Sequence, residues 1–371
     1  MRTRAAVVRE RGLLAIEEVR LAPPERGEVL VRIHAAGVCH SDLHALRGEL
    51  RAEPPLVLGH EGAGVVQAVG AAVTRCKPGD RVVINWLPAC ECCPTCLNGR
   101  HNLCERLAAT TFKARLLDGT TRLATAEGMP LGHMLGAATM AEHAVVDEAG
   151  IVPIPDGVPF DIAAVTGCAV ATGVGAVTNT AKAAPGVPAA VIGCGGVGLS
   201  SLLGCRLAGC NPIIAVDVLD SKLEFAKAMG ADATLNSSKA DKPAKELRSL
   251  TGGGPEYAFD TVGAGSTISL AIDSVRPGGA AVIVGLHAAQ QLVEISAGAL
   301  VLHNKRLLGS FAGSIRPRLD LPKLLDLYRS GRLALDGLVS KRYPLAALSQ
   351  AFDDMEAGHI ARGVLALAPQ A

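Results

Sequence analysis

The middle of the chain alternates short apolar runs with segments of helical periodicity. Apolar runs bounded by turn residues predict buried strands, and apolar positions three and four residues apart predict helices that cover them. The predicted strands are 189–192, 212–217, 257–262 and 280–286, and the predicted helices are a segment ending near 207, 221–229 and 266–275. This alternation is typical of a doubly wound parallel sheet, and therefore of the α/β class.

The two flanking regions have a different pattern. Residues 1–150 carry strand-like runs such as 28–34 and 62–69, which predict a β-rich domain. After about residue 311 the pattern predicts one amphipathic helix near 321–330 and a last strand at 363–367. A chain of 371 residues is long enough for two domains. We therefore predict a β-rich domain formed by 1–169 and 312–371, interrupted by a parallel-sheet domain at 170–311.

Composition narrows the possible partners. A hydrophobic share of 49% excludes intrinsic disorder. The formal net charge of +1 gives no reason to expect binding to nucleic acid or to an acidic membrane. The N-terminal residues have no apolar signal segment, and glycine or polar residues interrupt each apolar run. We expect a cytoplasmic protein that does not contact a membrane.

Five of the eleven cysteines lie between residues 90 and 104. In a long chain without a signal segment, such a cluster indicates metal binding rather than disulfides. Its spacing is C-x2-C-x2-C-x7-C, which predicts a closed, structural zinc site. The four predicted ligands are Cys90, Cys93, Cys96 and Cys104. The pattern gives no role to the remaining cysteine, Cys92.

A second candidate site is dispersed along the chain. Cys39 lies in GVCHSDLH, His60 in LGHEGAG and Cys168 in TGCA. Each residue alone is a weak signal, because a lone buried cysteine is more often a small core residue. Two cysteines and one histidine could hold a catalytic zinc with its fourth position open. The sequence does not show whether the three converge.

The glycine-rich turn GCGGVG at 193–198 follows a predicted strand and precedes a predicted helix. Gly193 permits the tight turn, Gly195 lets the backbone approach a pyrophosphate, and Gly198 allows close helix–strand packing. Gly196 and Val197 complete the predicted phosphate-binding turn at the helix N-terminus. Asp217, 19 residues past Gly198, predicts binding of the ribose of NAD and repulsion of the 2′-phosphate of NADP. The alternative is that this acid only caps the next helix.

These motifs together resemble the zinc-dependent, medium-chain alcohol dehydrogenase family over essentially the whole chain. The matching elements are GVCHSD at 37–42, GHEGAG at 59–64, the cysteine loop at 90–104, TGCAVATG at 166–173 and GCGGVG at 193–198. The resemblance implies a GroES-like, β-rich catalytic domain and a Rossmann cofactor domain. It implies two zinc ions per chain and NAD as cofactor.

The resemblance also implies roles for individual residues. Cys39, His60 and Cys168 would bind the catalytic zinc. Asp42 would orient His60, and Glu61 would be an acid close to that metal. Ser41 and His44 would relay a proton through the cofactor ribose. Further cofactor contacts are implied for His40, Thr172, Lys222 and Arg362. His44, His40 and Lys222 could instead be ordinary solvated side chains.

The implied activity is reversible oxidation of primary aliphatic, allylic or benzylic alcohols to aldehydes, by hydride transfer from a zinc-bound alkoxide to NAD. The residues implied to line the substrate pocket are Trp86, Met140, Leu286 and Phe311. The segment 107–140 resembles the longer loop of a dimeric subgroup, so we expect a homodimer, with a homotetramer as the alternative. The small-molecule partner is an alcohol or aldehyde.

Other functions stay open from the sequence alone. A glutathione-dependent formaldehyde dehydrogenase would need a basic pocket rim. The candidates for it are Arg115 and Arg122 of the segment 107–140, which we call the variable loop. A relative that holds NAD(H) tightly is a further alternative. The zinc-ligand motifs argue against a zinc-free reductase or a non-catalytic relative, and the neutral charge argues against a nucleic-acid-binding zinc module.

Overall fold

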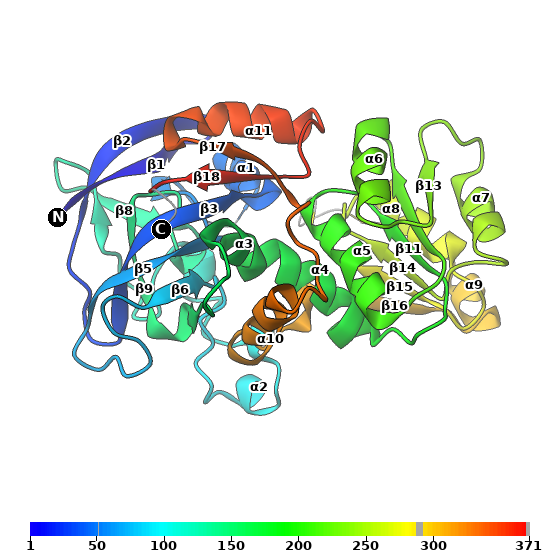
Figure 1. Ribbon diagram of the computed structural model, residues 1–371, viewed down its shortest axis with the longest axis horizontal. Helices are drawn as coiled ribbons and strands as arrows, with labels where there is room; N and C mark the ends of the chain where they lie inside the picture. Colours follow the sequence, from blue (N-terminus) through cyan, green and yellow to red (C-terminus); the bar gives the residue numbers. More distant parts are fainter. Residues whose placement is uncertain (51, 287–291, 369–371) are drawn as a thin grey trace.

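The computed structural model describes residues 1–50, 52–286 and 292–368, which form two lobes (Figure 1). One lobe consists mainly of strands, and we call it the β-rich lobe. The other contains a parallel sheet flanked by helices, and we call it the parallel-sheet lobe. The chain passes from the first lobe to the second and returns to the first at its C-terminal end.

The parallel-sheet lobe has the strand order β13-β12-β11-β14-β15-β16, with all neighbours parallel. The chain leaves the central strand β11 toward β12 and later returns to β14 on the other side. This reversal creates a topological switch point at the carboxyl end of β11. The strands are β11 Ala189–Ile192, β12 Ile213–Asp217, β13 Ala233–Asn236, β14 Tyr257–Asp260, β15 Ala280–Ile283 and β16 Arg306–Gly309.

Helices connect these strands and cover the sheet (Figure 1). They are α5 Gly196–Ala208, α6 Asp220–Ala228, α7 Pro243–Leu250, α8 Gly265–Ser274 and α9 Ala297–Leu302. The predicted doubly wound sheet is therefore confirmed. The pattern did not predict β13, α7, α9 or the edge strand β16, and three of the four residues of β16 are exposed. An edge strand without a continuous buried face lacks the apolar signal on which such a prediction depends.

The β-rich lobe contains a small closed barrel and a larger mixed sheet. The barrel strands are β1 Arg2–Glu10, β2 Leu13–Leu21, β4 Leu56–Val57, β7 Leu123–Ala124 and β8 Pro130–His133. The sheet strands are β3 Glu28–Val38, β5 Gly62–Val69, β6 Arg81–Ile84, β9 His143–Asp147, β10 Ile151–Pro153, β17 Val339–Tyr343 and β18 Arg362–Ala366. β18 pairs antiparallel with β3, so the C-terminal segment completes this lobe.

A continuous helical run links the two lobes. It consists of α3 Phe160–Val165, η5 Thr166–Val170, α4 Ala171–Gly175 and η6 Ala176–Ala181. By length and composition alone this run could cross a membrane, but its most apolar window is entirely buried inside the protein. The run passes residue 169 without a break, so the division of the domains at 169/170 and 311/312 stays a prediction.

The remaining helices lie around the β-rich lobe. The longer ones are α1 His40–Arg47, α10 Pro317–Arg329 and α11 Leu348–Glu356. The short ones are α2 Pro94–Leu97, η1 His101–Leu103, η2 Thr111–Lys113, η3 Met134–Gly136, η4 Glu148–Gly150, η7 Phe311–Ser314 and η8 Leu345–Ala347. One apolar core cluster contains Trp86 and Phe160 from the β-rich side together with Val191 and Phe259 from the parallel sheet. A core shared in this way holds the two lobes in a fixed relative position.

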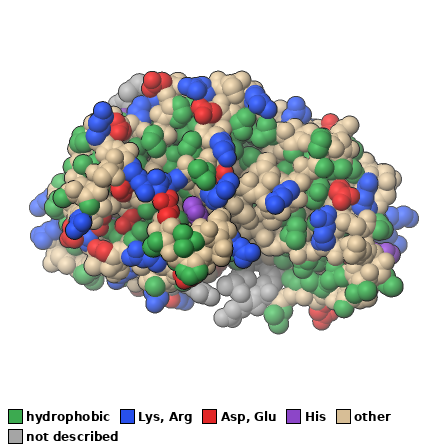
Figure 2. All heavy atoms as spheres, turned by 90° about the horizontal axis from the view of Figure 1, so that it is seen from below, with side chains coloured by type: hydrophobic (Ala, Val, Ile, Leu, Met, Phe, Trp, Pro, Cys, Tyr) green, Lys and Arg blue, Asp and Glu red, His purple; other side chains and the backbone are tan. Residues whose placement is uncertain are grey.

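Charged side chains of both signs are scattered among apolar and polar ones over the face drawn in Figure 2. This distribution agrees with the nearly balanced composition of 36 basic and 35 acidic residues. A face of mixed charge does not build up the strong positive potential that attracts a polyanion.

Candidate active site and metal centres

Cys39 lies where β3 ends and α1 begins. It is the N-cap residue of α1, with an extended backbone, and its N–H donates to Oδ2 of Asp42 at 3.0 Å. Both side chains are buried. This capping arrangement fixes the first turn of α1, and with it the positions of Cys39, Ser41 and Asp42 relative to one another.

His60 and Glu61 follow a tight turn at Gly59. The backbone of Gly59 has φ +102°, and a Cβ there would lie 2.2 Å from the backbone nitrogen of Met140. Only glycine fits this position, because a side chain would be strained and would also clash. The turn directs His60 and Glu61 into the interior, where their exposed fractions are 1% and 0%.

The structure brings the dispersed candidate ligands together. Ligand atoms of Cys39, His60 and Glu61 all lie within 4.8 Å of one another. Cys168 comes from η5, a π-helical turn, and its side chain is hydrogen-bonded to that of Cys39. This bond lowers the pKa of Cys39 well below its usual value and raises that of Cys168. Single π-helical turns of this kind are frequent at functional sites.

The chemistry of this cluster fits zinc. Nε2 of His60 is buried and has no hydrogen-bond partner. Its other ring nitrogen, Nδ1, lies 3.1 Å from Oδ1 of Asp42. Burial lowers the pKa of His60, but the charge and hydrogen bond of Asp42 outweigh that effect and raise it overall. A metal at Nε2 would satisfy the orphaned nitrogen, with Cys39 and Cys168 as thiolate ligands.

Glu61 connects this cluster to the parallel-sheet lobe. Burial raises the pKa of its carboxyl to about 7, against the opposing charge of Arg362. Its Oε1 accepts hydrogen bonds from the guanidinium of Arg362 and from the N–H of Ala169, at 3.2 Å for the latter. A Cβ on Gly196 would lie 3.0 Å from the Arg362 side chain. Arg362 therefore reaches from the acid beside the metal ligands to the glycine-rich turn.

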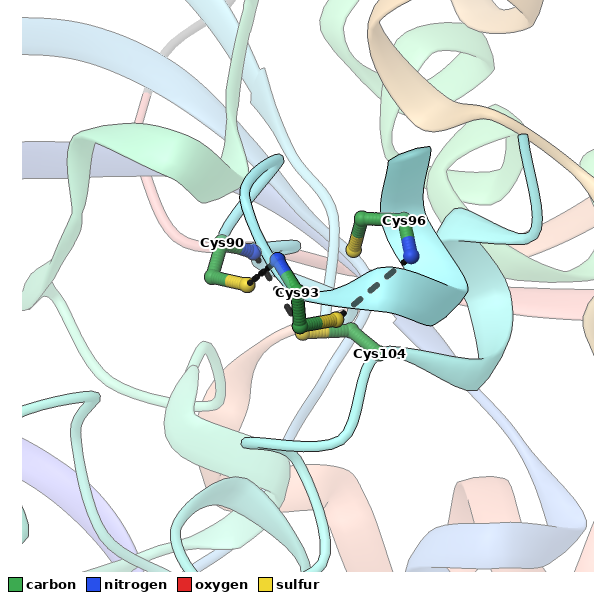
Figure 3. A group of neighbouring side chains, drawn as sticks. All are labelled: Cys90, Cys93, Cys96 and Cys104. Carbon is green, nitrogen blue, oxygen red and sulfur yellow. Dashed lines mark hydrogen bonds between the residues drawn. The ribbon is translucent and has the colours of Figure 1, made fainter. Parts of the chain in front are cut away.

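Four of the five cysteines of the 90–104 loop form a second candidate metal centre (Figure 3). The sulfurs of Cys90, Cys93, Cys96 and Cys104 all lie within 4.8 Å of one another. Backbone N–H groups donate to three of them: Cys93 to Cys90 at 3.3 Å, Cys96 to Cys93 at 3.4 Å, and Cys90 to Cys104 at 3.4 Å. Such bonds stabilise thiolates, and four thiolates fit a closed structural zinc site.

The residues between these ligands have other surroundings. Cys92 is exposed, and its pKa is raised because its thiol is hydrogen-bonded to Cys90. Glu91 has a positive φ of 58°, and both its carboxylate oxygens lie 2.6 Å from Nη1 of Arg318 at the start of α10. Sequence analysis gave neither residue a role. The Glu91–Arg318 pair joins the cysteine loop to a helix more than 200 residues away in the chain.

The candidate proton relay begins beside the metal ligands. Oγ of Ser41 lies 3.7 Å from Sγ of Cys39. His44 lies one helical turn further along α1, and its Nδ1 is hydrogen-bonded to the carboxylate of Glu49. Glu49 follows the left-handed helix end at Gly48, which turns the chain back toward His44. The sequence pattern gives no indication of Glu49, because only the geometry of the helix end brings it to His44.

The glycine-rich turn lies at the carboxyl end of β11, beside the switch point. Gly193 has φ +90°, and a Cβ on Gly198 would lie 1.7 Å from the carbonyl oxygen of Gly193. Both positions therefore require glycine. Gly195 caps α5, and Gly196 and Val197 form its first turn. The unpaired N–H groups of such a helix end can bind a pyrophosphate.

Asp217 ends β12 next to this turn. Its Oδ2 accepts the N–H of Cys194 at 2.7 Å, and its Oδ1 accepts the N–H groups of Val218 and Leu219. The carboxylate is 9% exposed, so it holds the turn in place and still presents some surface beside it. Lone pairs that remain on its oxygens are suited to accept ribose hydroxyls.

The other predicted cofactor residues surround the same region. The pKa of His40 is lowered, first by desolvation and then by the positive charges of Lys222 and Arg362. The charges of Lys222 and Arg362 therefore act on His40. Thr172 is half-buried in α4, which packs against α5. Their contacts to a cofactor stay predictions.

Aromatic side chains extend outward from the histidine ligand. The ring of Trp86 lies edge-on to His60 at 6.2 Å, Phe311 lies edge-on to Trp86 at 5.6 Å, and Phe112 lies edge-on to Phe311 at 6.0 Å. These edge-to-face contacts are favourable for aromatic rings. Phe112 comes from η2 in the variable loop, and sequence analysis did not identify it. We call Trp86, Phe311 and Phe112 the aromatic row.

The other two predicted pocket residues lie elsewhere. Met140 is fully buried in a core cluster of the β-rich lobe, where its N–H donates to the carbonyl of Leu58 at 3.0 Å. A side chain without accessible surface cannot contact a substrate, so this structure does not support Met140 as a pocket residue. Leu286 is 64% exposed beyond the end of β15, and its role stays a prediction.

Comparison with known proteins agrees with this geometry. Residues 25–156 match the family model described as alcohol dehydrogenase GroES-like domain, and residues 196–330 match zinc-binding dehydrogenase. An alcohol dehydrogenase class-3 from Myxine glutinosa is 39% identical, covering 95% of this chain and 94% of that protein. An S-(hydroxymethyl)glutathione dehydrogenase from Paracoccus denitrificans is 38% identical, covering 98% of this chain and 100% of that protein.

A solved structure extends the likeness to the fold. The crystal structure of benzyl alcohol dehydrogenase from Acinetobacter calcoaceticus superimposes with a TM-score of 0.93 at 30% identity, covering 99% of this chain and 100% of that one. Both domain models match in the expected order. The structure brings the four cysteines of the 90–104 loop together, and it places Cys39 beside His60 and Glu61. The GroES-like and Rossmann domains, the zinc sites and the NAD-binding turn are those of one enzyme class. The chain belongs to the zinc-dependent, medium-chain alcohol dehydrogenase family.

Proposed function

We propose that this alcohol dehydrogenase oxidises primary alcohols that carry an aromatic or allylic group, with NAD as the hydride acceptor. The proposal rests on the aromatic row of Trp86, Phe311 and Phe112. This row begins beside His60, where the centroid of the Trp86 ring lies 6.2 Å from that of the imidazole. Aromatic rings that line a substrate site favour a planar, apolar substituent on the reacting carbon.

The chain's own residues position the reaction. Cys39, His60 and Cys168 would hold zinc, and Asp42 keeps the imidazole of His60 oriented through its Nδ1. When bound, zinc polarises the substrate oxygen and NAD accepts the hydride. Ser41 would accept the proton that the alcohol loses, and His44 would exchange it with solvent. Arg362, beside the glycine-rich turn, would bind the cofactor pyrophosphate.

The test measures NADH absorbance with benzyl alcohol, cinnamyl alcohol, ethanol and 2-propanol. We expect turnover with NAD that is lost on chelation, and a higher kcat/KM for benzyl and cinnamyl alcohol than for ethanol or 2-propanol. Equal kcat/KM for benzyl alcohol and ethanol would contradict the role of the aromatic row. NADH absorbance of the protein as isolated identifies a tightly held cofactor.

A second candidate function is oxidation of S-(hydroxymethyl)glutathione. The names of the two curated relatives favour it over the first proposal. Arg122, one candidate for binding the anionic adduct, is buried and paired with Glu28 at 2.7 Å and Asp118 at 2.6 Å, so it is not free to bind a substrate. Turnover of formaldehyde that depends on added glutathione, and exceeds that of benzyl alcohol, would establish this function.

We also propose a homodimer formed at the free edge of the parallel sheet. The edge strand β16 has no outer neighbour within the described chain, and α9 beside it has no buried residue. Val301 and Leu302 of α9 are 79% and 83% exposed. Unpaired strand edges and exposed apolar residues favour association. Light scattering distinguishes a dimer from the alternative tetramer, and Val301→Glu should shift the mass toward a monomer.

A further inference from the structure

The segment that connects the candidate zinc ligands Cys96 and Cys104 contains a buried polar side chain, Asn102. Asn102 lies in η1 and is 5% exposed. Its Nδ2 donates a hydrogen bond of 2.9 Å to the backbone carbonyl of Phe311, 209 residues further along the chain. A buried amide that donates to a distant backbone carbonyl fixes that part of the backbone, because breaking the bond would leave both groups unpaired.

The backbone that Asn102 contacts has an unusual conformation and is held by several side chains. Phe311 begins η7, where Ala312, Gly313 and Ser314 have positive φ values of 49°, 64° and 49°. Non-glycine residues in this conformation are strained and persist only where their surroundings fix them. Thr180 is hydrogen-bonded to Ser310 and Ser314 at 2.8 Å each, and Asn179 donates to the carbonyl of Gly313 at 3.3 Å. Asn102 is the side chain that donates to the carbonyl of Phe311 itself.

Phe311 is also the central member of the aromatic row. Its ring contacts Trp86 on one side and Phe112 on the other, and it is 38% exposed. A partly exposed ring on a strained turn can move unless its backbone is held. Its ring therefore lies between Trp86, beside the candidate metal ligands, and Phe112 of η2.

We propose that Asn102 is a positioning residue for substrate specificity, through which the loop of the structural metal centre holds Phe311 in the aromatic row. Asn102 touches no reacting atom and acts through the backbone of Phe311. The pair Glu91–Arg318 supports the same connection, because it ties the loop to the first turn of α10, which follows η7. The expected effect on substrate specificity rests on the proposed function, the preference for aromatic alcohols.

The substrate test compares the parent protein with Asn102→Ala and with Asn102→Asp, which keeps the shape but lacks the N–H donor. We expect the ratio of kcat/KM for benzyl alcohol to kcat/KM for ethanol to fall about threefold to tenfold in both variants, the range that loss of one hydrogen bond gives. The matched control is Asn98→Ala, since Asn98 is an exposed amide in the same loop. Its ratio should equal that of the parent.

A second readout does not depend on turnover. Trp86 is the only tryptophan in the chain, is 8% exposed and contacts the ring of Phe311, so its fluorescence reports on that contact. We expect acrylamide to quench Trp86 more strongly in Asn102→Ala and Asn102→Asp, and Phe311→Ala to give the same change. Zinc content and the melting temperature show whether each variant keeps the fold and both metals.

The two readouts separate the inference from the proposed function. Stronger quenching in both Asn102 variants supports the positioning role even if the enzyme prefers another alcohol. Unchanged quenching and an unchanged substrate ratio in a folded, zinc-replete Asn102→Asp protein would overturn it. If Asn102→Ala does not fold, Asn102→Asp alone decides. A variant in which all substrates lose activity equally, with unchanged quenching, would also contradict the inference.

Discussion

Oδ1 of Asp42 lies 3.1 Å from Nδ1 of His60, and both side chains are buried. The other oxygen of Asp42 accepts the N–H of Cys39 at 3.0 Å. One carboxylate therefore orients two candidate ligands of the same zinc ion. Second-layer carboxylates of this kind fix the tautomer of a ligating histidine and increase its basicity.

Replacing Asp42 should weaken zinc binding at this site. We expect Asp42→Ala to lower zinc affinity about 10-fold to 100-fold, and Asp42→Asn to have a smaller effect because its amide oxygen still accepts one of the two bonds. Zinc content after dialysis against a competing chelator measures the change. Asp156→Asn, an exposed carboxylate, is the control and should bind zinc as the parent does.

Cys39 and Cys92 should differ in their importance for turnover and for zinc binding. Cys39→Ala should abolish turnover in a folded protein and lower the metal content from about two zinc ions per chain to about one, because an open zinc site needs three protein ligands. Cys92→Ala should keep turnover and both metals, since Cys92 is exposed. Near parental activity in Cys39→Ala would remove this residue from the zinc site.

Asp217 should select the cofactor and also stabilise the fold. Asp217→Gly should lower the affinity for NAD and reduce the preference for NAD over NADP, because the carboxylate would no longer repel a 2′-phosphate. It also removes the acceptor of three backbone N–H groups, so the free energy of unfolding should fall by roughly 1–3 kcal/mol.

The two effects of Asp217 are measured separately. The ratio of kcat/KM for NAD to kcat/KM for NADP reports on the cofactor, and urea unfolding reports on stability. Asp220→Asn, at an exposed position three residues further on, is the control. An unchanged cofactor ratio in Asp217→Gly would leave the acid with only its structural role.

His133 should make the protein sensitive to acid. Burial lowers the pKa of this side chain to about 3, and the charges of Arg122 and Arg115 add to the effect. In the unfolded chain, His133 takes up a proton as the pH falls through about 6.5, whereas in the folded chain it stays neutral down to about pH 3. Its contribution to the free energy of unfolding is therefore fully present above about pH 6.5 and is lost as the pH decreases toward 3. Between pH 6.5 and pH 5 the loss from this group is about 2 kcal/mol.

Urea unfolding at several pH values tests this prediction. His133→Gln keeps an acceptor for the N–H of Arg122, which Nε2 accepts at 3.1 Å in the parent. We expect its stability to fall less between pH 6.5 and pH 5 than that of the parent. His359→Gln, an exposed control, should follow the parent. Parallel curves for His133→Gln and the parent would show that His133 does not cause the acid sensitivity.

Features that depend on short-range spacing could be predicted from the amino-acid sequence. The turn at Gly193–Gly198 requires glycine because its own backbone is close, and the spacing of Cys90, Cys93, Cys96 and Cys104 lets one loop surround a metal. Helix and strand periodicity likewise predicted the central strands and their covering helices. Such features arise from residues a few positions apart, so one sequence is enough to identify them.

Contacts between residues far apart in the chain could not be predicted in this way and are seen in the folded protein. Asn102 reaches Phe311 across 209 residues, and Arg122 is buried against Glu28 rather than available to a substrate. Met140, expected beside the substrate, is enclosed in the core. These contacts follow from how sheets and loops pack against one another. The residues next to each position in the sequence do not show which distant residue it will contact. The sequence motifs therefore predict the metal and cofactor chemistry, whereas the shape of the substrate site depends on packing between separate parts of the chain.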